Sequence, residues 1–490
     1  MDVLQQIVDT INTYLSDYIL IFLLVGCGLY FSIRTKFVQV RCFGEGMKNV
    51  FGNIKFKGEK QRGGLSSFQS LATAVAAQVG TGNIVGASAA IFVGGPGAIF
   101  WMWIIAFLGM ATIYSEAVLA QKTKVTYENG NVEGGPIYYI KTAFSGKMGK
   151  FLAGFFAVSA VIALGFVGAM VQSNSIASNF ATFFDNFGWD ATAVKIAVGI
   201  IVAVFAGFVL IGGTTRLASV TEKIVPIMAS LYIVGGIFVL MINVTVLPAA
   251  FATIFKYAFV PQALIGGGIG AALKSAISQG AKRGLFSNEA GMGSTPHAHA
   301  LAKVKDPHTQ GTTAMIGVFI DTFVVLTMTA LVVISTLYCG DAAVINPDSY
   351  SSLVEGGFDK SAMAQVAFST TFAKLFGETA GNIIGGLFVT ICLFFFAFST
   401  ILSWNYFGKV NFTYLFGKKT TLVYSIIAVV FVFLGAIFQN DLVWSLTDMF
   451  NNLMVIPNVI ALIALGGMVV SMTKFRKNGE LTLEEEKLTK

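Results

Sequence analysis

Charged residues are scarce in this chain, and the scarcity excludes an ordinary soluble protein. Asp, Glu, Lys and Arg make up only 12% of the 490 residues, whereas soluble domains carry about 25%. Hydrophobic residues account for 55%, and the mean hydropathy is +0.75. The composition therefore predicts an all-α protein that crosses a lipid bilayer several times.

Other features are missing as well. The chain has four cysteines, two of them inside apolar runs without an evident partner, which argues against a disulfide framework. The N-terminal segment MDVLQQIVDTINTYLSD (1–17) is acidic where a signal peptide would be basic, so we expect the first apolar span to be retained as a helix. No GxxxxGK[ST] motif occurs, so neither a nucleotide partner nor ATP-driven pumping is expected.

The distribution of charge predicts topology. A net charge of +7 could suggest a nucleic-acid partner, but the basic residues are scattered through the loops between apolar spans. With the N-terminus outside, most of the 32 Lys and Arg residues lie on the inner side, while the outer segments 184–190 and 339–359 are acid-rich. The positive-inside rule therefore predicts an outer N-terminus and a cytoplasmic C-terminus. The inner basic segments are 34–62, 122–150, 409–419 and 474–490.

The apolar stretches predict eleven transmembrane helices, because roughly 20 residues of helix cross a bilayer. With the first helix set aside, ten remain, and they divide into five and five. Because five is odd, the second half enters the membrane from the opposite side, as an inverted-topology repeat requires. The predicted spans are 14–33, 66–95, 96–121, 151–182, 191–211, 224–247, 262–302, 312–338, 380–407, 421–438 and 442–472. The predicted divisions are an extra helix with its cytoplasmic loop (1–65), two five-helix repeats (66–260 and 261–472) and a cytoplasmic tail (473–490).

Each half opens with a glycine-interrupted segment, QVGTGNIVG (78–86) in the first and GLFSNEAGMGSTP (284–296) in the second. Unwinding a helix in hydrocarbon frees backbone polar groups that must find partners. In transporters the freed carbonyls coordinate cations, and the half-helix N-termini hold anionic groups. Tight helix packing is the alternative, because small residues are common in transmembrane interfaces. Two such segments at matching positions favour a binding site.

A longer motif follows the first break. The segment GGPGAIFWMWIIAFLG (94–109) places two tryptophans in a glycine-rich, uncharged run. It resembles the motif of the alanine or glycine:cation symporters, and the resemblance extends to SNEAGMGSTPHAHA (287–300) and across essentially the whole chain. The resemblance implies a leucine-transporter-type fold preceded by one additional helix, which agrees with the one-plus-ten helix count. It also implies sodium-coupled uptake of a small neutral amino acid across the inner (plasma) membrane of a prokaryote.

The resemblance further implies two sites. The amides around Gly82 would receive the substrate carboxylate, and Phe286 would form an aromatic lid over a pocket walled by Met292 and Trp404. Such walls leave little room beyond a methyl group, so we expect alanine, glycine and D-alanine to bind and leucine to be rejected. The predicted substrate residues are Thr81, Gly82, Asn83, Gln172, Phe286, Glu289, Gly291, Met292, Thr400 and Trp404. The predicted Na⁺ ligands are the carbonyls of Ala76 and Val79 and the hydroxyls of Ser399 and Thr400.

Several polar residues allow two interpretations. Gln172 either contacts the substrate or forms an interhelical hydrogen bond. Asp321, deep in its span, either forms a second cation site with Asn83 or pairs with cations or hydroxyls of neighbouring helices. Glu289 either contacts the substrate amine or caps the half-helix that follows.

Five further residues near the inner or outer ends of helices have simpler interpretations. His297 and His299 lie two apart and so point to different helix faces; they are interpreted as surface histidines, not metal ligands. Glu116 is expected in an interfacial or gate salt bridge. Lys282 and Arg283 either form part of an outer gate or anchor the helix end at the membrane surface.

Three other functions compete with sodium symport. A proton-coupled amino-acid carrier would use Asp321 or Glu289 as the titrating group. A passive channel would need a continuous polar stripe or a ring of carbonyls, whereas the spans are mostly uniformly apolar. An intramembrane enzyme would need a nucleophile and base, and no such pair is apparent, so the protein is not expected to be an enzyme.

Overall fold

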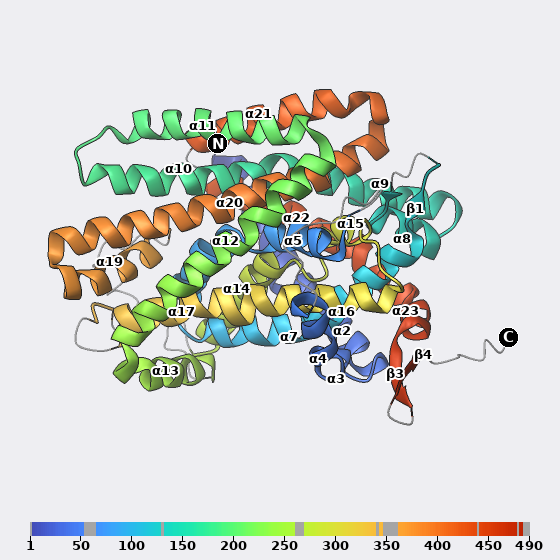
Figure 1. The fold of residues 1–490 in the computed structure, drawn as a ribbon, viewed down its shortest axis with the longest axis horizontal. Helices are drawn as coiled ribbons and strands as arrows, with labels where there is room; N and C mark the ends of the chain where they lie inside the picture. The colour runs from blue at the N-terminus through green and yellow to red at the C-terminus, as the bar shows by residue number, and fades with distance from the viewer. Residues whose placement is uncertain are drawn as a thin grey trace.

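The computed structural model describes residues 2–52, 65–128, 132–259, 269–339, 343–345, 361–438, 441–477 and 480–483. Helices dominate the described residues, and most of them run along the long axis of the molecule, which is horizontal in Figure 1. One end, at the left of the view, holds α13, α19 and the α10–α11 turn. The opposite end holds α8, α23 and two short antiparallel strand pairs.

The N-terminal part forms one long span followed by two short helices. The span Val3–Arg34 contains a π-helical segment, Leu15–Leu20, between its two α-helices. The chain then reverses at Lys36 and Phe37, both with positive φ, and the two short helices fold back towards the body of the protein. These helices are α1 (Asp2–Tyr14), α2 (Ile21–Arg34), α3 (Val38–Arg41) and α4 (Phe43–Phe51).

The first predicted repeat begins with a broken helix. Ser66 caps α5, because its hydroxyl accepts from Gln69 N and the Gln69 side chain accepts from Ser66 N. The helix stops at Gln78 and resumes at Gly82 with a bend of 46°. The elements of this part are α5 (Ser67–Gln78), α6 (Ala87–Gly94), α7 (Ala98–Thr123), β1 (Val125–Thr126), β2 (Val132–Glu133), α8 (Pro136–Ala143), α9 (Gly146–Ala160), α10 (Ala169–Asp185), α11 (Ala191–Ile211), α12 (Gly213–Ile242) and α13 (Leu247–Phe259).

The second predicted repeat also begins with an interrupted helix. Here α14 ends at Asn288, and α15 begins at Pro296 after seven intervening residues. The next span, Pro307–Tyr338, is continuous, and α20 is the longest single helix in the described residues. The elements are α14 (Ile269–Asn288), α15 (Pro296–His299), α16 (Pro307–Val318), α17 (Thr327–Val333), α19 (Met363–Phe376), α20 (Glu378–Phe416), α21 (Thr421–Ile437), α22 (Asp441–Ala464), α23 (Gly466–Met472), β3 (Lys474–Lys477) and β4 (Glu480–Leu483).

The predicted spans can be compared with these helices. Nine described helices are long and apolar enough to cross a membrane, or ten when the bent pair α5–α6 counts as one span. Of the predicted span 262–302, residues 262–268 lie outside the described part, and the rest contains α14 and α15. The predicted start of the span at 224 was wrong, because α12 begins at Gly213. The first turns of α12 contain charged residues and lie before the apolar stretch from which the span was predicted, because a helix can extend beyond the bilayer into water.

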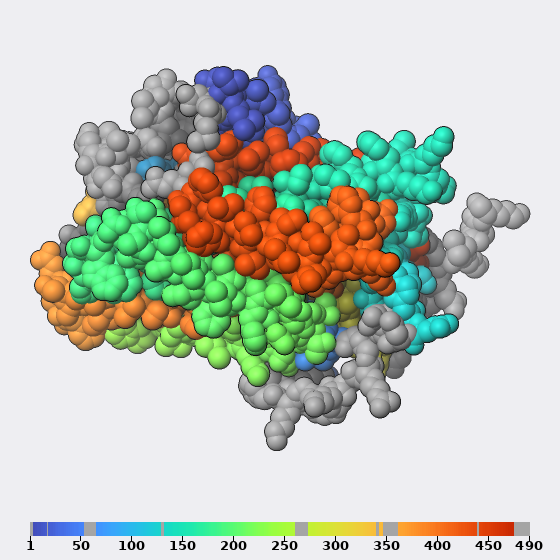
Figure 2. Space-filling view, turned by 90° about the horizontal axis from the view of Figure 1, so that it is seen from above, coloured from blue at the N-terminus to red at the C-terminus, as the bar shows by residue number. Residues whose placement is uncertain are grey.

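Exposed apolar side chains form a lipid-facing surface. On α11, Val204 and Phe208 are each 64% exposed, and on α21, Leu422 and Ile426 are 57% and 54% exposed. Figure 2 shows these two helices packed side by side on one face of the molecule. Soluble proteins rarely leave such contiguous apolar area in water. The surface therefore fits a protein embedded in a bilayer.

Candidate functional site

The first break is closed by polar contacts from within and from a neighbouring helix. Gly80 N donates to Asn83 Oδ1 at 3.1 Å, and Thr81 N donates to Oε1 of Gln172, on α10, at 3.2 Å. Glycine is required at position 80, since an added Cβ would lie 2.3 Å from Thr400 Oγ1. The buried hydroxyl of Thr81 has no hydrogen-bond partner among the described residues. A buried polar group of this kind is normally satisfied, so it indicates a place for a ligand.

The second break is held by a buried carboxylate. Glu289, Gly291 and Gly293 all have positive φ, so the chain leaves the helical path after Asn288. Glu116, on α7, accepts the freed amides of Gly291 and Gly293 at 3.2 Å and 3.0 Å. It also accepts from Asn458 Nδ2, on α22, at 2.6 Å. These bonds supply the partners that an unwound helix needs in an apolar environment.

The interpretation of Glu116 as part of a salt bridge was therefore wrong. Its side chain is fully buried, and its described partners are two backbone amides and an amide side chain. Sequence reasoning missed this role because Asn458 lies more than 300 residues away. Two features of the sequence could have indicated this role. Glu116 is an acid inside an apolar span, and the glycine-rich segment 284–296 leaves backbone amides without helical partners.

The two breaks meet at Asp321. Asn83 Nδ2 donates to Asp321 Oδ1 at 2.7 Å and to its backbone carbonyl at 3.0 Å. The hydroxyl of Ser287, from α14, lies 2.9 Å and 3.0 Å from the two carboxylate oxygens, and that of Thr322 donates at 2.8 Å. Gly82 allows this approach, because a Cβ there would lie 3.0 Å from Ser287 Cα. One buried carboxylate thus joins both broken segments to the span that carries it.

Two hydroxyls of α20 face the end of α5. Thr400 Oγ1 donates to Ala76 O at 2.9 Å, and Ser399 Oγ lies 3.3 Å from the same oxygen. Thr400 Oγ1 also lies 3.3 Å from a second carbonyl oxygen of α5, that of Ala77. The described bonds of Thr400 do not include the carbonyl of Val79. Val79 is the C-cap residue directly after α5, and its amide donates to Val75 O. Three of the four predicted sodium ligands therefore lie together, and Val79 stays a prediction.

Aromatic side chains surround the second break. The rings of Phe286 and Trp404 meet edge to face with centroids 5.5 Å apart. The Trp404 indole N–H donates to Glu289, which also accepts from the Ser294 hydroxyl. Glu289 therefore borders the predicted pocket wall, and its carboxylate caps no backbone amide among these bonds. Met292 is fully buried.

Gly291 was predicted to contact the substrate, but in this structure its backbone amide and carbonyl both bond to other residues. Its amide donates to Glu116, and its carbonyl accepts from Asn458 at 2.9 Å. An added Cβ would lie 2.9 Å from Leu24 of the N-terminal span. The residue therefore lies between the second break and the extra helix, so its place in the substrate site stays a prediction.

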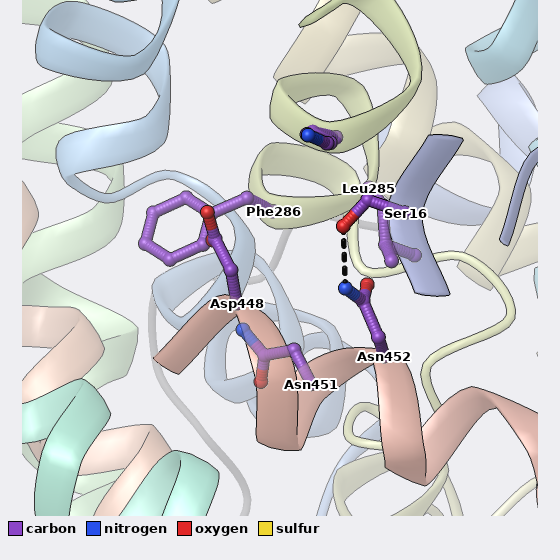
Figure 3. Close-up of a pocket in the computed structure, with 7 residues that line it drawn as sticks. Ser16, Leu285, Phe286, Asp448, Asn451 and Asn452 are labelled. Atoms are coloured by element: carbon purple, nitrogen blue, oxygen red, sulfur yellow. Dashed lines mark hydrogen bonds between the residues drawn. The ribbon is translucent and has the colours of Figure 1, made fainter. Parts of the chain in front are cut away.

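A charged pair lies beyond the Phe286 ring. Arg283 and Asp448 form a salt bridge of 3.2 Å, and the Arg283 guanidinium lies 5.3 Å from the ring centroid of Trp444. Trp444 in turn packs on Phe286, with centroids 5.4 Å apart. Figure 3 shows Asp448 beside the Phe286 ring, at a cavity of about 10 Å³ that is too small for an amino acid.

A large cavity is lined in part by Arg283 of this salt bridge. Its volume is about 1030 Å³, and Arg283 and Trp444 are among its lining residues together with Asn174 and Ser178 of α10. The order along this path is cavity, then Arg283 and Trp444, then Phe286, then Trp404. Arg283 thus lies between this cavity and the Phe286 ring, with its side chain 14% exposed. This position favours the outer-gate alternative over surface anchoring, and the gate role stays a prediction. Sequence reasoning missed Asp448 and Trp444 because no local pattern marks their partners.

The interpretation of the two histidines as surface residues was also wrong. His297 is 1% exposed and His299 is fully buried. The His297 ring stacks against Phe156 and Phe407, and its nitrogens bond to Ser294 O and Asn411 Nδ2. His299 Nδ1 lies 2.8 Å from Gln310 Nε2. These contacts pack the short helix α15 into the core.

Comparison with known proteins places this geometry in a family context. The profile of the Sodium:alanine symporter family matches residues 1–488. The chain is 39% identical over 478 residues to the Sodium/alanine symporter AgcS of Methanococcus maripaludis, covering 96% of this chain and 98% of that protein. It is 38% identical over 467 residues to the Putative sodium/proton-dependent alanine carrier protein YrbD of Bacillus subtilis, covering 94% and 90%.

The solved structure of MhsT in complex with L-phenylalanine aligns with a TM-score of 0.60 at 14% identity, covering 84% of this chain and 93% of that one. At this identity the likeness concerns the fold alone, and it confirms the predicted leucine-transporter-type fold. Family and fold are those of membrane transporters, so the protein is a transporter and not an enzyme. The chain belongs to the sodium:alanine symporter family.

Proposed function

We propose that the protein imports small neutral amino acids, namely alanine, glycine and D-alanine, together with Na⁺ by alternating access. The observation that carries this proposal is the position of Thr400. Its hydroxyl bonds to Ala76 O, and a Cβ on Gly80 would overlap it. The predicted cation ligands thus adjoin the turn that is predicted to hold the substrate, so that occupation of one site can strengthen the other.

Sodium is proposed to bind between α5 and α20. The proposed ligands are the carbonyls of Ala76 and Val79 and the hydroxyls of Ser399 and Thr400. All four residues are buried, and their oxygens carry no formal charge. A neutral oxygen set suits a monovalent cation, which must be bound strongly enough to enter and weakly enough to leave.

The substrate is proposed to bind at the first break. Gly82 begins the half-helix that continues into α6, and the N-terminus of a helix attracts a carboxylate. The unpaired, buried hydroxyl of Thr81 offers a further contact there. Gln172, bonded to the Thr81 amide, would hold this turn in place and face the substrate.

The pocket for the substrate side chain is proposed to lie between the breaks and α20. Phe286, Met292 and Trp404 are its proposed walls, and Glu289, bonded to the Trp404 indole, is proposed to contact the substrate amine. Gly291 is proposed to lie at the edge of the substrate site, farther from the substrate than these side chains. These walls are proposed to leave little room beyond a methyl group, which would favour alanine and glycine, and a methyl side chain would define handedness poorly.

A second cation is proposed at Asn83 and Asp321. The carboxylate is buried and accepts only from neutral donors, so no described side chain compensates its charge. A proton is the alternative occupant, and this observation favours a proton-coupled carrier as the second candidate function. The name of the Bacillus subtilis relative YrbD, sodium/proton-dependent alanine carrier protein, is consistent with either coupling ion.

The proposal includes the orientation and the division of the chain. The N-terminus is placed outside and the C-terminus in the cytoplasm of a prokaryotic cell, with repeats at 66–260 and 261–472 flanked by segments 1–65 and 473–490. In this orientation the cavity of about 1030 Å³ opens towards the outer side. The Arg283–Asp448 pair would then separate it from the substrate site.

Uptake of labelled alanine into proteoliposomes tests the function directly. We expect saturable uptake that requires an inward sodium gradient and disappears when choline replaces sodium at constant pH. Uptake that persists in choline and follows a proton gradient would instead establish the proton-coupled carrier. Flux that does not saturate and shows no counterflow would indicate a channel.

A further inference from the structure

Three side chains of types that can bind a metal ion lie together outside the proposed transport site. Cys42 lies between α3 and α4, Glu45 is in the first turn of α4, and His308 is in the first turn of α16. Their ligand atoms all lie within 4.8 Å of one another. The cluster is at the end of the molecule that carries β3, because Lys474 N lies 3.4 Å from His308 Nδ1.

The His308 ring is oriented as a metal ligand would be. Its Nδ1 lies 2.7 Å from the Tyr114 hydroxyl, and its Nε2 lies 3.2 Å from Glu45 Oε2. Tyr114 also donates to Thr473 Oγ1 at 3.1 Å, so its oxygen can accept a hydrogen bond from Nδ1 in the tautomer that is protonated there, whereas the longer 3.4 Å bond from Lys474 N to Nδ1 suits the other tautomer. A metal-binding histidine usually donates its second ring N–H in this way, which leaves the other nitrogen for the metal.

The chemistry of the three ligands selects a particular kind of ion. A thiolate, an imidazole and a carboxylate are ligands of Zn²⁺, which commonly takes three protein groups and a water. Hard cations such as Mg²⁺ and Ca²⁺ prefer oxygen only. The thiolate and the carboxylate together supply two negative charges, which match a divalent cation.

The cluster is also accessible from one side. Cys42 is 1% exposed and His308 is fully buried, whereas the Glu45 side chain is 22% exposed. Ligand atoms around a zinc ion lie about 3.5 Å apart, so the group must contract slightly. Glu45 can move to do so because it is partly in solvent. An ion would therefore enter past Glu45.

The positively charged side chains beside the cluster bond to other oxygen atoms. Arg41 donates to Lys474 O at 2.8 Å and to Thr35 O at 3.1 Å. The Lys474 ammonium forms a 2.7 Å salt bridge with Asp306. Both positive groups thus have oxygen partners, and the same bonds connect α3, the loop before α16 and β3.

We propose that Cys42, Glu45 and His308 form a zinc site that inhibits transport by fastening α4 to α16. The helix α16 is part of the continuous span Pro307–Tyr338, which also carries Asp321. A metal ion between α4 and His308 would therefore restrain the span that contacts both broken segments. The inhibition, but not the binding, rests on the proposed transport function.

Metal binding is tested on the purified full chain without alanine or sodium. We expect calorimetric titration to give one Zn²⁺ per chain, and Co²⁺ to give the absorption bands of a thiolate-bound tetrahedral ion. Cys42→Ser and His308→Gln should each weaken binding by about tenfold or more. Glu45→Gln, at a partly exposed position, removes one ligand charge with little risk to folding. Cys392→Ser, a buried thiol elsewhere, is the matched control and should bind like wild type.

The outcomes separate the two parts of the proposal. No binding to wild type, or equal binding to the Cys42, Glu45 and His308 variants, would overturn the site. We expect Zn²⁺ to lower alanine uptake by half or more in wild type, reversibly with a chelator, and to have no such effect in Cys42→Ser. Binding at the site without any change in uptake would refute the inhibition. A wild type without sodium-driven uptake would refute the proposed function, while the calorimetric result would stand.

Discussion

Gly80→Ala tests the contact between the proposed sodium site and the first break. The added Cβ would lie 2.3 Å from Thr400 Oγ1, 3.1 Å from Thr400 Cβ and 3.3 Å from Gln172 Oε1. Unstrained contacts of this kind are about 3.5 Å, so Thr400 must shift by roughly 1 Å. Such a shift would break its 2.9 Å bond to Ala76 O and displace one proposed cation ligand.

The size of the effect follows from the cost of overpacking. An extra methyl group in a packed interior costs about 1–3 kcal/mol, which corresponds to roughly a 5- to 150-fold change in affinity. We expect the sodium concentration for half-maximal alanine uptake to rise within this range in proteoliposomes. Gly80 does not have positive φ, so the effect is steric and not conformational.

Gly86→Ala is the matched control in the same broken helix. Gly86 is also buried, but the nearest atom to an added Cβ is Thr81 O at 3.9 Å, which is an ordinary contact. Alanine also favours the helix over glycine. We expect this variant to transport like wild type. An unchanged sodium dependence in Gly80→Ala, or an equal loss in both variants, would refute the proposed contact.

Five further variants, at four positions, test other parts of the site. Thr400→Ala should raise the sodium concentration for half-maximal uptake by about tenfold, the loss of about one hydrogen-bond-sized interaction, with amino-acid preference unchanged; a normal sodium curve would remove Thr400 from the site. Gln172→Ala should weaken alanine binding while sodium affinity is largely retained, and normal alanine affinity would favour the packing interpretation. Trp404→Ala should let leucine and valine compete with labelled alanine, whereas strong leucine competition already in wild type would contradict the pocket assignment. Glu116→Ala should lower the free energy of unfolding by about 1–3 kcal/mol for each buried donor left unpaired, seen as a lower thermal midpoint in detergent, and Glu116→Gln should be milder because its amide oxygen still accepts; equal midpoints for both variants and wild type would show that Glu116 does not hold the second break.

The amino-acid sequence was sufficient for the membrane class and for the two breaks. A run of about 20 apolar residues has no stable alternative to a membrane helix, and glycine-rich turns within such runs disturb it locally. These are properties of short segments, so QVGTGNIVG and the segment 284–296 could be identified without tertiary information. The short helices α3, α4, α8 and α19 were not predicted, because they are too short for the span criterion.

The partners of the buried polar residues were decided only by the tertiary structure. Glu116 was interpreted as part of a salt bridge, yet it accepts from backbone amides of the non-helical segment after α14 and from Asn458 of α22. His297 was placed on the surface, yet it stacks between aromatic rings of α9 and α20. A polar side chain inside a membrane protein must find a partner wherever the fold provides one. Sequence alone determined that such partners were needed; helix packing determined which residues, often hundreds of positions apart, became those partners.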